Sequence, residues 1–312
     1  MSSSDLWVSA HNQNISSAMF HWDGFNWTSF PLGSTVNGVL TGASALGKVW
    51  CSASNDCYVV GSANNGKGMI FHWDGASWTE DPNEPFSKAL EEVWGFDANN
   101  VFVKGWKTTG YKVWRKVGLS WVDMSIPTPW TYGRYYGLWG LNPTSLYVAG
   151  EVEDQNGNAT QGVVAFYNGI SWSTLPVPVG VVSLSSVNGT SVNDLYVTGR
   201  MSDGSGVVYH VTNNGSTWTL ANKDATIAGY GPVWSKYPGT FLASGYKAPA
   251  GPGQLRITTY DANGASTNSV DATAYNPVVF WPDGNSGVVF YASDASQLLG
   301  DNLAGFYSGN CN

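Results

Sequence analysis

Short runs of alternating apolar and polar residues, each ended by glycine, recur along the whole chain. Clear examples are CYVVG from residue 57, VFVKG from residue 101, LYVAG from residue 146 and LYVTG from residue 195. Alternation with a period of two, together with enrichment in Val, Tyr and Phe, predicts β-strands. No segment shows a sustained 3.6-residue period, so we expect almost no helix.

Two tryptophan markers show that these strands belong to a repeat. The first is an apolar residue followed by Trp or its replacement, at residues 49, 93, 138, 187, 233 and 280, with spacings of 44 to 49 residues. The second is the Trp of GxxW, at residues 27, 78, 121, 172 and 218, with spacings of 43 to 51 residues. Both spacings match the roughly 40–50 residues of one four-stranded propeller blade.

The repeat predicts an all-β fold, a β-propeller of four-stranded antiparallel blades in a single domain. Counting second strands favours seven blades, with repeats at about 1–35, 36–82, 83–127, 128–176, 177–222, 223–271 and 272–312. The first repeat starts at its second strand, and the last stops after its third. A six-bladed propeller, in which both chain ends share one composite blade, is the alternative.

Composition narrows the classes of partner. The chain has 312 residues, a formal net charge of −8 and only 14 Lys and Arg, which do not cluster. Nucleic-acid binding needs a concentrated basic surface, so we expect none. No apolar run approaches the length of a membrane span, so we expect no membrane insertion.

The polar surface residues are mostly Asn, Ser and Thr, which favours an extracellular or cell-surface protein, although MSSSDLW lacks the apolar centre of a signal peptide. Cys51 and Cys57 flank a turn-like segment, and we expect a disulfide across that hairpin. Cys311 is left over. Were it bonded to either of the other two, the last repeat would lie against the second, which would favour six blades.

The segment HWDGASW from His72 recurs as HWDGFNW from His21. Gly75 suits a tight turn, Asp74 can accept hydrogen bonds from the amides of that turn, and we expect Trp78 to pack between blades. His21, His72 and His210 hold matching positions on different blades, so we interpret them as structural residues rather than as a metal site.

This turn resembles the Asp-box of sialidase-type propellers, Ser-x-Asp-x-Gly-x-x-Trp. TNNGSTW from Thr212 fits that pattern best, with Asn214 in place of the Asp. More loosely, the repeat looks like those of secreted bacterial propellers and of tectonin-type lectins. The resemblance implies a propeller and says little about activity, because Asp-boxes lie away from active sites. Sialidases also use an Arg triad in an Arg-Ile-Pro context, which none of the four Arg of this chain matches.

Long, diverse loops predict the binding face. They join second to third strands or link successive blades, so they share one face, whereas the opposite face carries short repeated turns. Recognition usually lies in variable loops on a regular scaffold. The richest patch there is aromatic and polar, and the predicted ligand-binding residues are Trp106, Lys107, Tyr111, Trp130, Tyr132, Arg134, Tyr135 and Glu151.

Carboxylates on the same face allow two further interpretations. Glu151, Glu153, Asp154 and Asn156 form an acidic loop whose oxygens could bind Ca²⁺. The run is not an EF-hand loop, so the favoured interpretation is a solvated loop, and we expect no cofactor. Glu91 and Glu92 begin a first strand, and with Glu151 they could serve a glycosidase or lyase.

Three functions follow from these features. The leading one is a non-enzymatic, lectin-like propeller whose partners are glycans or a glycoprotein. The second is a protein–protein interaction scaffold that uses the same face. The third is a carbohydrate-active enzyme with a central acidic pocket. Lectin sites should recur from blade to blade, whereas a catalytic site should be singular.

Overall fold

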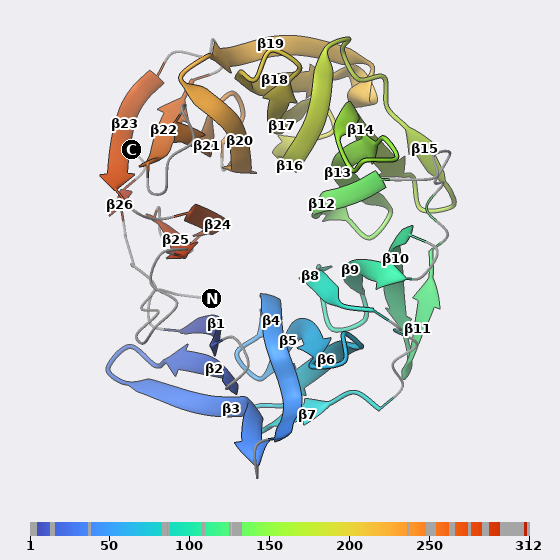
Figure 1. Cartoon of the computed structure of the whole chain (residues 1–312), viewed down its shortest axis with the longest axis vertical. Coiled ribbons are helices and arrows are strands. Elements are labelled where there is room, and N and C mark those ends of the chain that lie inside the picture. The colour runs from blue at the N-terminus through green and yellow to red at the C-terminus, as the bar shows by residue number, and fades with distance from the viewer. Residues whose placement is uncertain are drawn as a thin grey trace. The chain divides into compact units, whose positions relative to one another are not determined.

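A computed structural model describes residues 5–12, 16–36, 39–82, 86, 88–107, 110–124, 126, 133–235, 237–247, 254–261, 266–273, 276–282, 287–293 and 309–310. Within these residues the chain is built of β-strands, with one 3-10 turn at Asn213–Gly215 (Figure 1). They form two compact units: the first runs to Ile126, the second from residue 133 to Trp281, and short C-terminal segments divide between them. The predicted all-β architecture is confirmed.

The first unit contains strands β1 to β11. Their bounds are β1 (Leu6–Asn12), β2 (Ser16–Trp22), β3 (Trp27–Val36), β4 (Val39–Ala53), β5 (Asp56–Ala63), β6 (Gly68–Trp73), β7 (Trp78–Glu80), β8 (Leu90–Gly95), β9 (Val101–Lys107), β10 (Gly110–Val117) and β11 (Ser120–Asp123). All neighbours pair antiparallel. The long β4 joins two blades, because its first residues pair with β3 and the rest pair with β5.

The second unit contains three four-stranded blades in sequential order. They are β12 (Gly133–Asn142), β13 (Ser145–Glu153), β14 (Ala159–Tyr167) and β15 (Trp172–Thr174); β16 (Val181–Ser191), β17 (Asp194–Met201), β18 (Gly206–Thr212) and β19 (Thr217–Asp224); and β20 (Ile227–Trp234), β21 (Phe241–Lys247), β22 (Gln254–Tyr260) and β23 (Ser266–Thr273).

Near the C-terminus, β24 (Asn276–Pro282), β25 (Gly287–Ser293) and β26 (Gly309–Asn310) form a three-stranded sheet. Within the described residues, β1 to β7 form one seven-stranded sheet in which β4 joins two blades, four further sheets have the predicted four antiparallel strands, and a three-stranded group lies at the end of the chain. The number of blades and the repeat boundaries stay predictions.

Within each unit, neighbouring blades pack face to face and share buried side chains. In the first unit, Trp50 and Tyr58 of one blade share a buried cluster with Val93, Val103 and Trp114 of the next. In the second unit, a similar cluster joins β17 and β18 to β20 and β21. This packing buries the middle of the second strands β5, β9, β13, β17 and β21, as expected of sheets covered on both faces.

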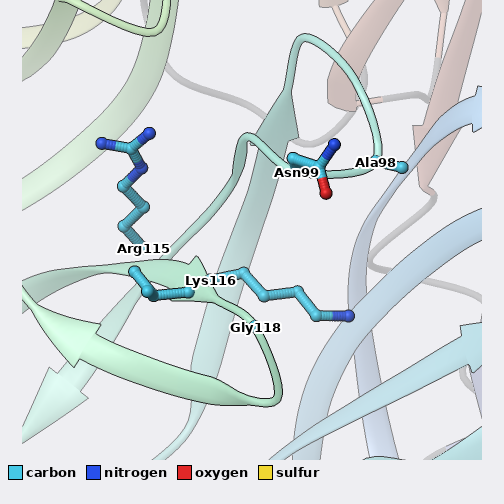
Figure 2. A pocket seen from close by; sticks show the side chains of 6 residues that line it. Ala98, Asn99, Arg115, Lys116 and Gly118 are labelled. Carbon is cyan, nitrogen blue, oxygen red and sulfur yellow. The ribbon is translucent and has the colours of Figure 1, made fainter.

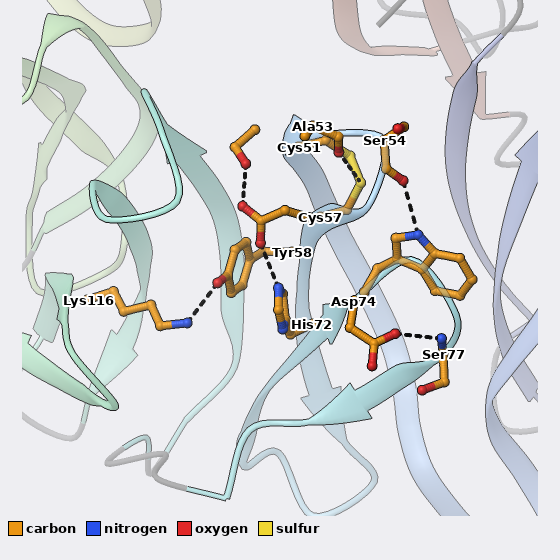
Figure 3. Close-up of polar contacts among 12 residues, drawn as sticks. Cys51, Ala53, Ser54, Cys57, Tyr58, His72, Asp74, Ser77 and Lys116 are labelled. Carbon is orange, nitrogen blue, oxygen red and sulfur yellow. Dashed lines mark hydrogen bonds and ion pairs between the residues drawn. A yellow bond between two sulfur atoms is a disulfide. The ribbon is translucent and has the colours of Figure 1, made fainter.

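The HWDGASW turn has the geometry expected from its residues. The Asp74 carboxylate accepts hydrogen bonds from the backbone amides of Ala76 and Ser77, both at 2.8 Å, and Gly75 has a φ of +97° (Figure 3). Trp78 packs edge-on against Trp7 of the preceding blade, with ring centroids 5.2 Å apart. The predicted roles of the turn and of its last Trp are confirmed.

A second repeated unit, which the sequence reading missed, fixes the three histidines. His72 Nε2 hydrogen-bonds the Asp56 carboxylate at 2.6 Å and its ring stacks on Tyr58 at 4.5 Å (Figure 3). The same arrangement joins Asp5, Trp7 and His21 in another blade, and Asp194, Tyr196 and His210 in a third. We call this set of Asp, aromatic and His the blade triad. It confirms that these histidines are structural.

The predicted disulfide is present: Cys51 and Cys57 face each other across the β4–β5 hairpin and are bonded (Figure 3). Neither is then available to Cys311, which lies outside the described residues. The six-bladed alternative therefore loses the support that a bond from Cys311 to the second repeat would have given it.

Candidate functional site

One extra residue interrupts the first strand of each of five blades, at the same place in the repeat. In β8, Leu90 pairs with Gly105 and Glu92 with Lys104, so Glu91 is the unpaired residue of a β-bulge. The equivalent bulges lie after Leu46, Tyr135, Leu184 and Tyr230. Bulges redirect side chains and occur often beside functional sites.

The bulged residue varies between blades: it is Gly47, Glu91, Tyr136, Ser185 or Gly231. The residues on either side of it belong to the constant frame, because the preceding Leu or Tyr is buried in all five blades. A variable residue in a fixed frame is where individual blades can acquire different functions.

Lys104 breaks the pattern of the second strands. It is 1% exposed, and its position in the other described blades is held by Val60, Ala149, Thr198 and Ser244, all fully buried. Burying an ammonium group is expensive unless it is paired. A lysine in place of a small core residue therefore marks this blade as different from the rest.

Two glutamates of β8 compensate the buried lysine. Lys104 Nζ lies 2.9 Å from Glu91 Oε2 and 3.9 Å from Glu92 Oε2. Glu92, whose side chain is 3% exposed, also pairs through Oε1 with Lys48 from β4. The result is a network of two lysines and two glutamates with no net charge.

Glu91 is the glutamate that reaches the surface, because its side chain is 39% exposed. Its second oxygen, Oε1, accepts a hydrogen bond of 3.1 Å from the Tyr111 hydroxyl. The ring of Trp106 packs against the ring of Tyr111 at a tilt of 51°, with centroids 4.6 Å apart, and Trp106 is 38% exposed. Glu91, Tyr111, Trp106 and Lys104 thus form one cluster, which we call the β8–β10 site.

Predicted residues of the second unit form a separate group. The exposed Arg134 pairs with Glu153 at 2.7 Å, and the hydroxyl of Tyr136 donates to Glu151 at 2.7 Å. Burial, and then the hydrogen bond to Glu151, raise the pKa of the Tyr136 hydroxyl. Glu151 itself is buried, so its carboxylate serves this internal contact.

The remaining predicted residues have other positions. Tyr135 is buried in the core, where Leu90 stands in the preceding blade, and Tyr136 is the surface tyrosine of this bulge. Lys107 ends β9, and its side chain is not among the described ones. Trp130 and Tyr132 lie outside the described residues.

The acidic loop after β13 is held by its own hydrogen bonds. The Asp154 carboxylate accepts from the backbone amides of Asn156 and Asn158, and from the Asn158 side chain. These bonds hold the pKa of Asp154 below its usual range. Within the described ranges no three His, Cys, Asp or Glu side chains lie together as a metal site. Calcium binding here stays a prediction.

A shallow hollow of about 330 Å³ lies at the opposite, short-turn end of the same blade as the β8–β10 site (Figure 2). Its walls come from the β8–β9 turn at Ala98 and Asn99 and from the β10 end. The side chains of Arg115 and Lys116 point in opposite directions there. Arg115 donates a hydrogen bond of 2.7 Å to the Asn100 side chain, and Lys116 donates one of 2.7 Å to the Tyr58 hydroxyl. Since both cations serve contacts within the fold, we interpret the hollow as a structural feature.

No described helix is long and apolar enough to cross a membrane. No protein-family model matches the chain, and no curated protein matches its sequence.

Solved structures do match. A WD40 β-propeller domain of Doa1 is similar with a TM-score of 0.65 at 13% identity, over 99% of this chain and 90% of that one. The β-propeller domain of the trilobed protease from Pyrococcus furiosus has a TM-score of 0.63 at 10% identity, over the same shares. A fucose-specific lectin from Aleuria aurantia has a TM-score of 0.53 at 14% identity, over 83% of this chain and 92% of that one. The fold is a β-propeller.

Proposed function

We propose that this protein is a non-enzymatic glycan-binding propeller, and that the β8–β10 site of the first unit is its principal sugar site. The observation that carries the proposal is an exposed indole, Trp106, joined through Tyr111 to a half-exposed carboxylate, Glu91. The proposed location is extracellular or at the cell surface, which the Cys51–Cys57 disulfide supports.

The chemistry of a sugar ring suits this pair of groups. The C–H face of a hexose is apolar and packs on an aromatic ring, while its hydroxyls need hydrogen-bond partners at the edge. Trp106 offers the apolar platform. Glu91 offers carboxylate oxygens that accept hydrogen bonds from hydroxyls, and charge-assisted bonds of this kind are the stronger ones.

The rigidity of the cluster favours binding. Tyr111 is buried and fixes both partners, since its ring supports Trp106 and its hydroxyl holds Glu91. Side chains that are already ordered lose less conformational entropy when a ligand binds. The fucose-specific lectin among the similar structures is a further reason to test sugars, although at its low identity it supports only the fold.

Binding to a glycan array, followed by titration of the best oligosaccharide, tests the proposal. We expect Trp106→Ala to weaken binding by about 5-fold to 150-fold, because one stacked ring contributes about 1–3 kcal/mol. Trp27→Ala is the matched control: Trp27 is 43% exposed but follows a short turn at the other end of its blade. It should leave affinity unchanged.

Two results would contradict the proposal. One is a wild-type protein that binds no sugar on the array and instead retains a specific protein ligand, which would favour the interaction scaffold. The other is an equal loss of affinity in Trp106→Ala and Trp27→Ala, which would show that binding does not depend on the β8–β10 site.

A further inference from the structure

We infer that Lys104 is a positioning residue that makes Glu91 a fixed hydrogen-bond acceptor, so that the β8–β10 site selects neutral glycans and rejects those that carry carboxylate groups. This inference rests on the proposed function and names the ligand class of the same site. It follows from how the four charges of the network are distributed between the core and the surface.

Both oxygens of Glu91 are held from the inside. Lys104 Nζ contacts Oε2 at 2.9 Å, and the Tyr111 hydroxyl donates to Oε1 at 3.1 Å. Each carboxylate oxygen has two lone pairs, so one on each remains for a ligand. The ligand must therefore bring donors, and two neighbouring hydroxyls of a sugar fit this requirement.

Both lysines of the network are paired with its glutamates. Lys104 is 1% exposed and lies over the Tyr111 ring at 5.5 Å, so its ammonium group faces the protein. Lys48 is partly exposed, but it pairs with Glu92. A negatively charged ligand on Trp106 would meet the Glu91 carboxylate with no unpaired cation in this network to offset the repulsion.

Comparison of Lys104 with the equivalent residue of another blade indicates that the lysine serves the site and is not needed for folding. Val60 fills the equivalent place in the preceding blade and is fully buried, so the frame does not require a lysine. Replacement of Lys104 by Val should leave a folded blade in which Glu91 keeps only its tyrosine contact. Replacement by Arg should restore an ion pair.

Pairs of oligosaccharides with the same linkages, one neutral and one with a hexuronic acid in place of a terminal hexose, test the inference by titration. We expect the wild-type protein to bind the acidic member at least tenfold more weakly, with a smaller difference at high salt. In Glu91→Gln, whose amide can donate as well as accept, the two affinities should differ less than about threefold.

Lys104→Val should lose about tenfold in affinity for the neutral member, and Lys104→Arg should regain most of it. Equal or tighter binding of the hexuronate by the wild-type protein would overturn this inference and leave the proposed function standing. An unchanged ratio in Glu91→Gln, or unchanged affinity in Lys104→Val, would also overturn it. Failure of every pair to bind would overturn the proposed function, and this inference with it.

Discussion

Asp74 and Asn168 occupy the same place in two turns and have side chains of nearly the same shape, one charged and one neutral. Each accepts hydrogen bonds from the two amides that follow in the turn, Ala76 and Ser77 for Asp74, and Ile170 and Ser171 for Asn168. The chain itself therefore supplies a neutral version of the turn. This makes it possible to separate the effect of charge from the effect of shape.

The turn amides, first Ser77 and then Ala76, hold the pKa of Asp74 below its usual range. A lowered folded-state pKa stabilises the protein above the unfolded value of about 4, and this contribution is lost as the pH falls through the folded value. We expect Asp74→Asn to be less stable than wild type at pH 7 and to match it more closely toward pH 2. Thermal unfolding at several pH values measures the difference.

Asp74→Ala is the control for shape, because alanine cannot accept the two amide hydrogen bonds. It should be less stable than Asp74→Asn at every pH. If the wild type and Asp74→Asn differ by the same amount at pH 7 and at pH 2, the carboxylate charge does not contribute to the turn.

Tyr135 and Tyr136 show what sequence alone could not resolve at this scale. Both belong to an aromatic run, and alternation does not tell which one faces the core. The bulge adds one residue to the strand, so Tyr135 takes the buried place of Leu90 and Tyr136 reaches the surface. Aligning the repeats would have shown it, since Leu46, Leu90 and Leu184 all precede the bulge.

The blade triad is a structural element that the sequence contains but that single-residue inspection misses. The Asp and His of each triad are 16 residues apart in three blades, with the aromatic two residues after the Asp. In the blade of β13 and β14, Phe166 packs against Tyr147 instead, with ring centroids 4.8 Å apart and a tilt of 30°. Contact between two rings is therefore common to these four blades, and three of them add the hydrogen bond.

His72→Phe and His72→Ala separate these two contributions. We expect His72→Ala to lower the free energy of unfolding by about 1–2 kcal/mol, because it removes both the stacked ring and the hydrogen bond to Asp56. His72→Phe keeps the ring, as Phe166 does, and should lose less. Urea unfolding followed by tryptophan fluorescence measures both variants, and equal losses would argue against stacking as the main contribution.

The disulfided hairpin between β4 and β5 offers a second test at the scale of one element. The bond closes a loop of a few residues, so its entropic contribution is small by the standards of disulfides, about 2 kcal/mol. We expect Cys51→Ala/Cys57→Ala to lose about this much stability in urea while keeping the β-sheet circular dichroism. Cys311→Ala is the control and should unfold like the wild type.

At the scale of the whole chain, the period of the tryptophan markers was sufficient to predict four-stranded antiparallel blades. The long, diverse loops predicted a binding site at one end of the blades, and Trp106, Tyr111 and Glu91 meet at that end. Lys104 could not be predicted as a core residue, because in the alternating strand VFVKG a lysine is expected on the solvent-exposed face. Blades cover each second strand on both faces, so the strand is buried throughout and the lysine with it.

The repeat also bears on how many ligands one chain binds. A lectin built from equivalent blades should bind several sugars, yet the β8–β10 site combines residues that occur together in one blade. At the three positions of Glu91, Lys104 and Trp106, the preceding blade has Gly47, Val60 and Ser62. In the second unit, the next two blades have Tyr136, Ala149 and Glu151, and then Ser185, Thr198 and Arg200. None of these sets offers both an exposed aromatic platform and a carboxylate as exposed as that of Glu91.

We therefore expect isothermal titration calorimetry with a neutral oligosaccharide that the protein binds to give one strong site per chain. Glu91→Gln should weaken that site, whereas Glu151→Gln, which alters the buried partner of Tyr136, should leave both affinity and stoichiometry unchanged. Two or more equivalent sites per chain would show instead that binding depends on features common to the blades, such as the short turns. The variable bulge residues would then serve the fold or a different partner.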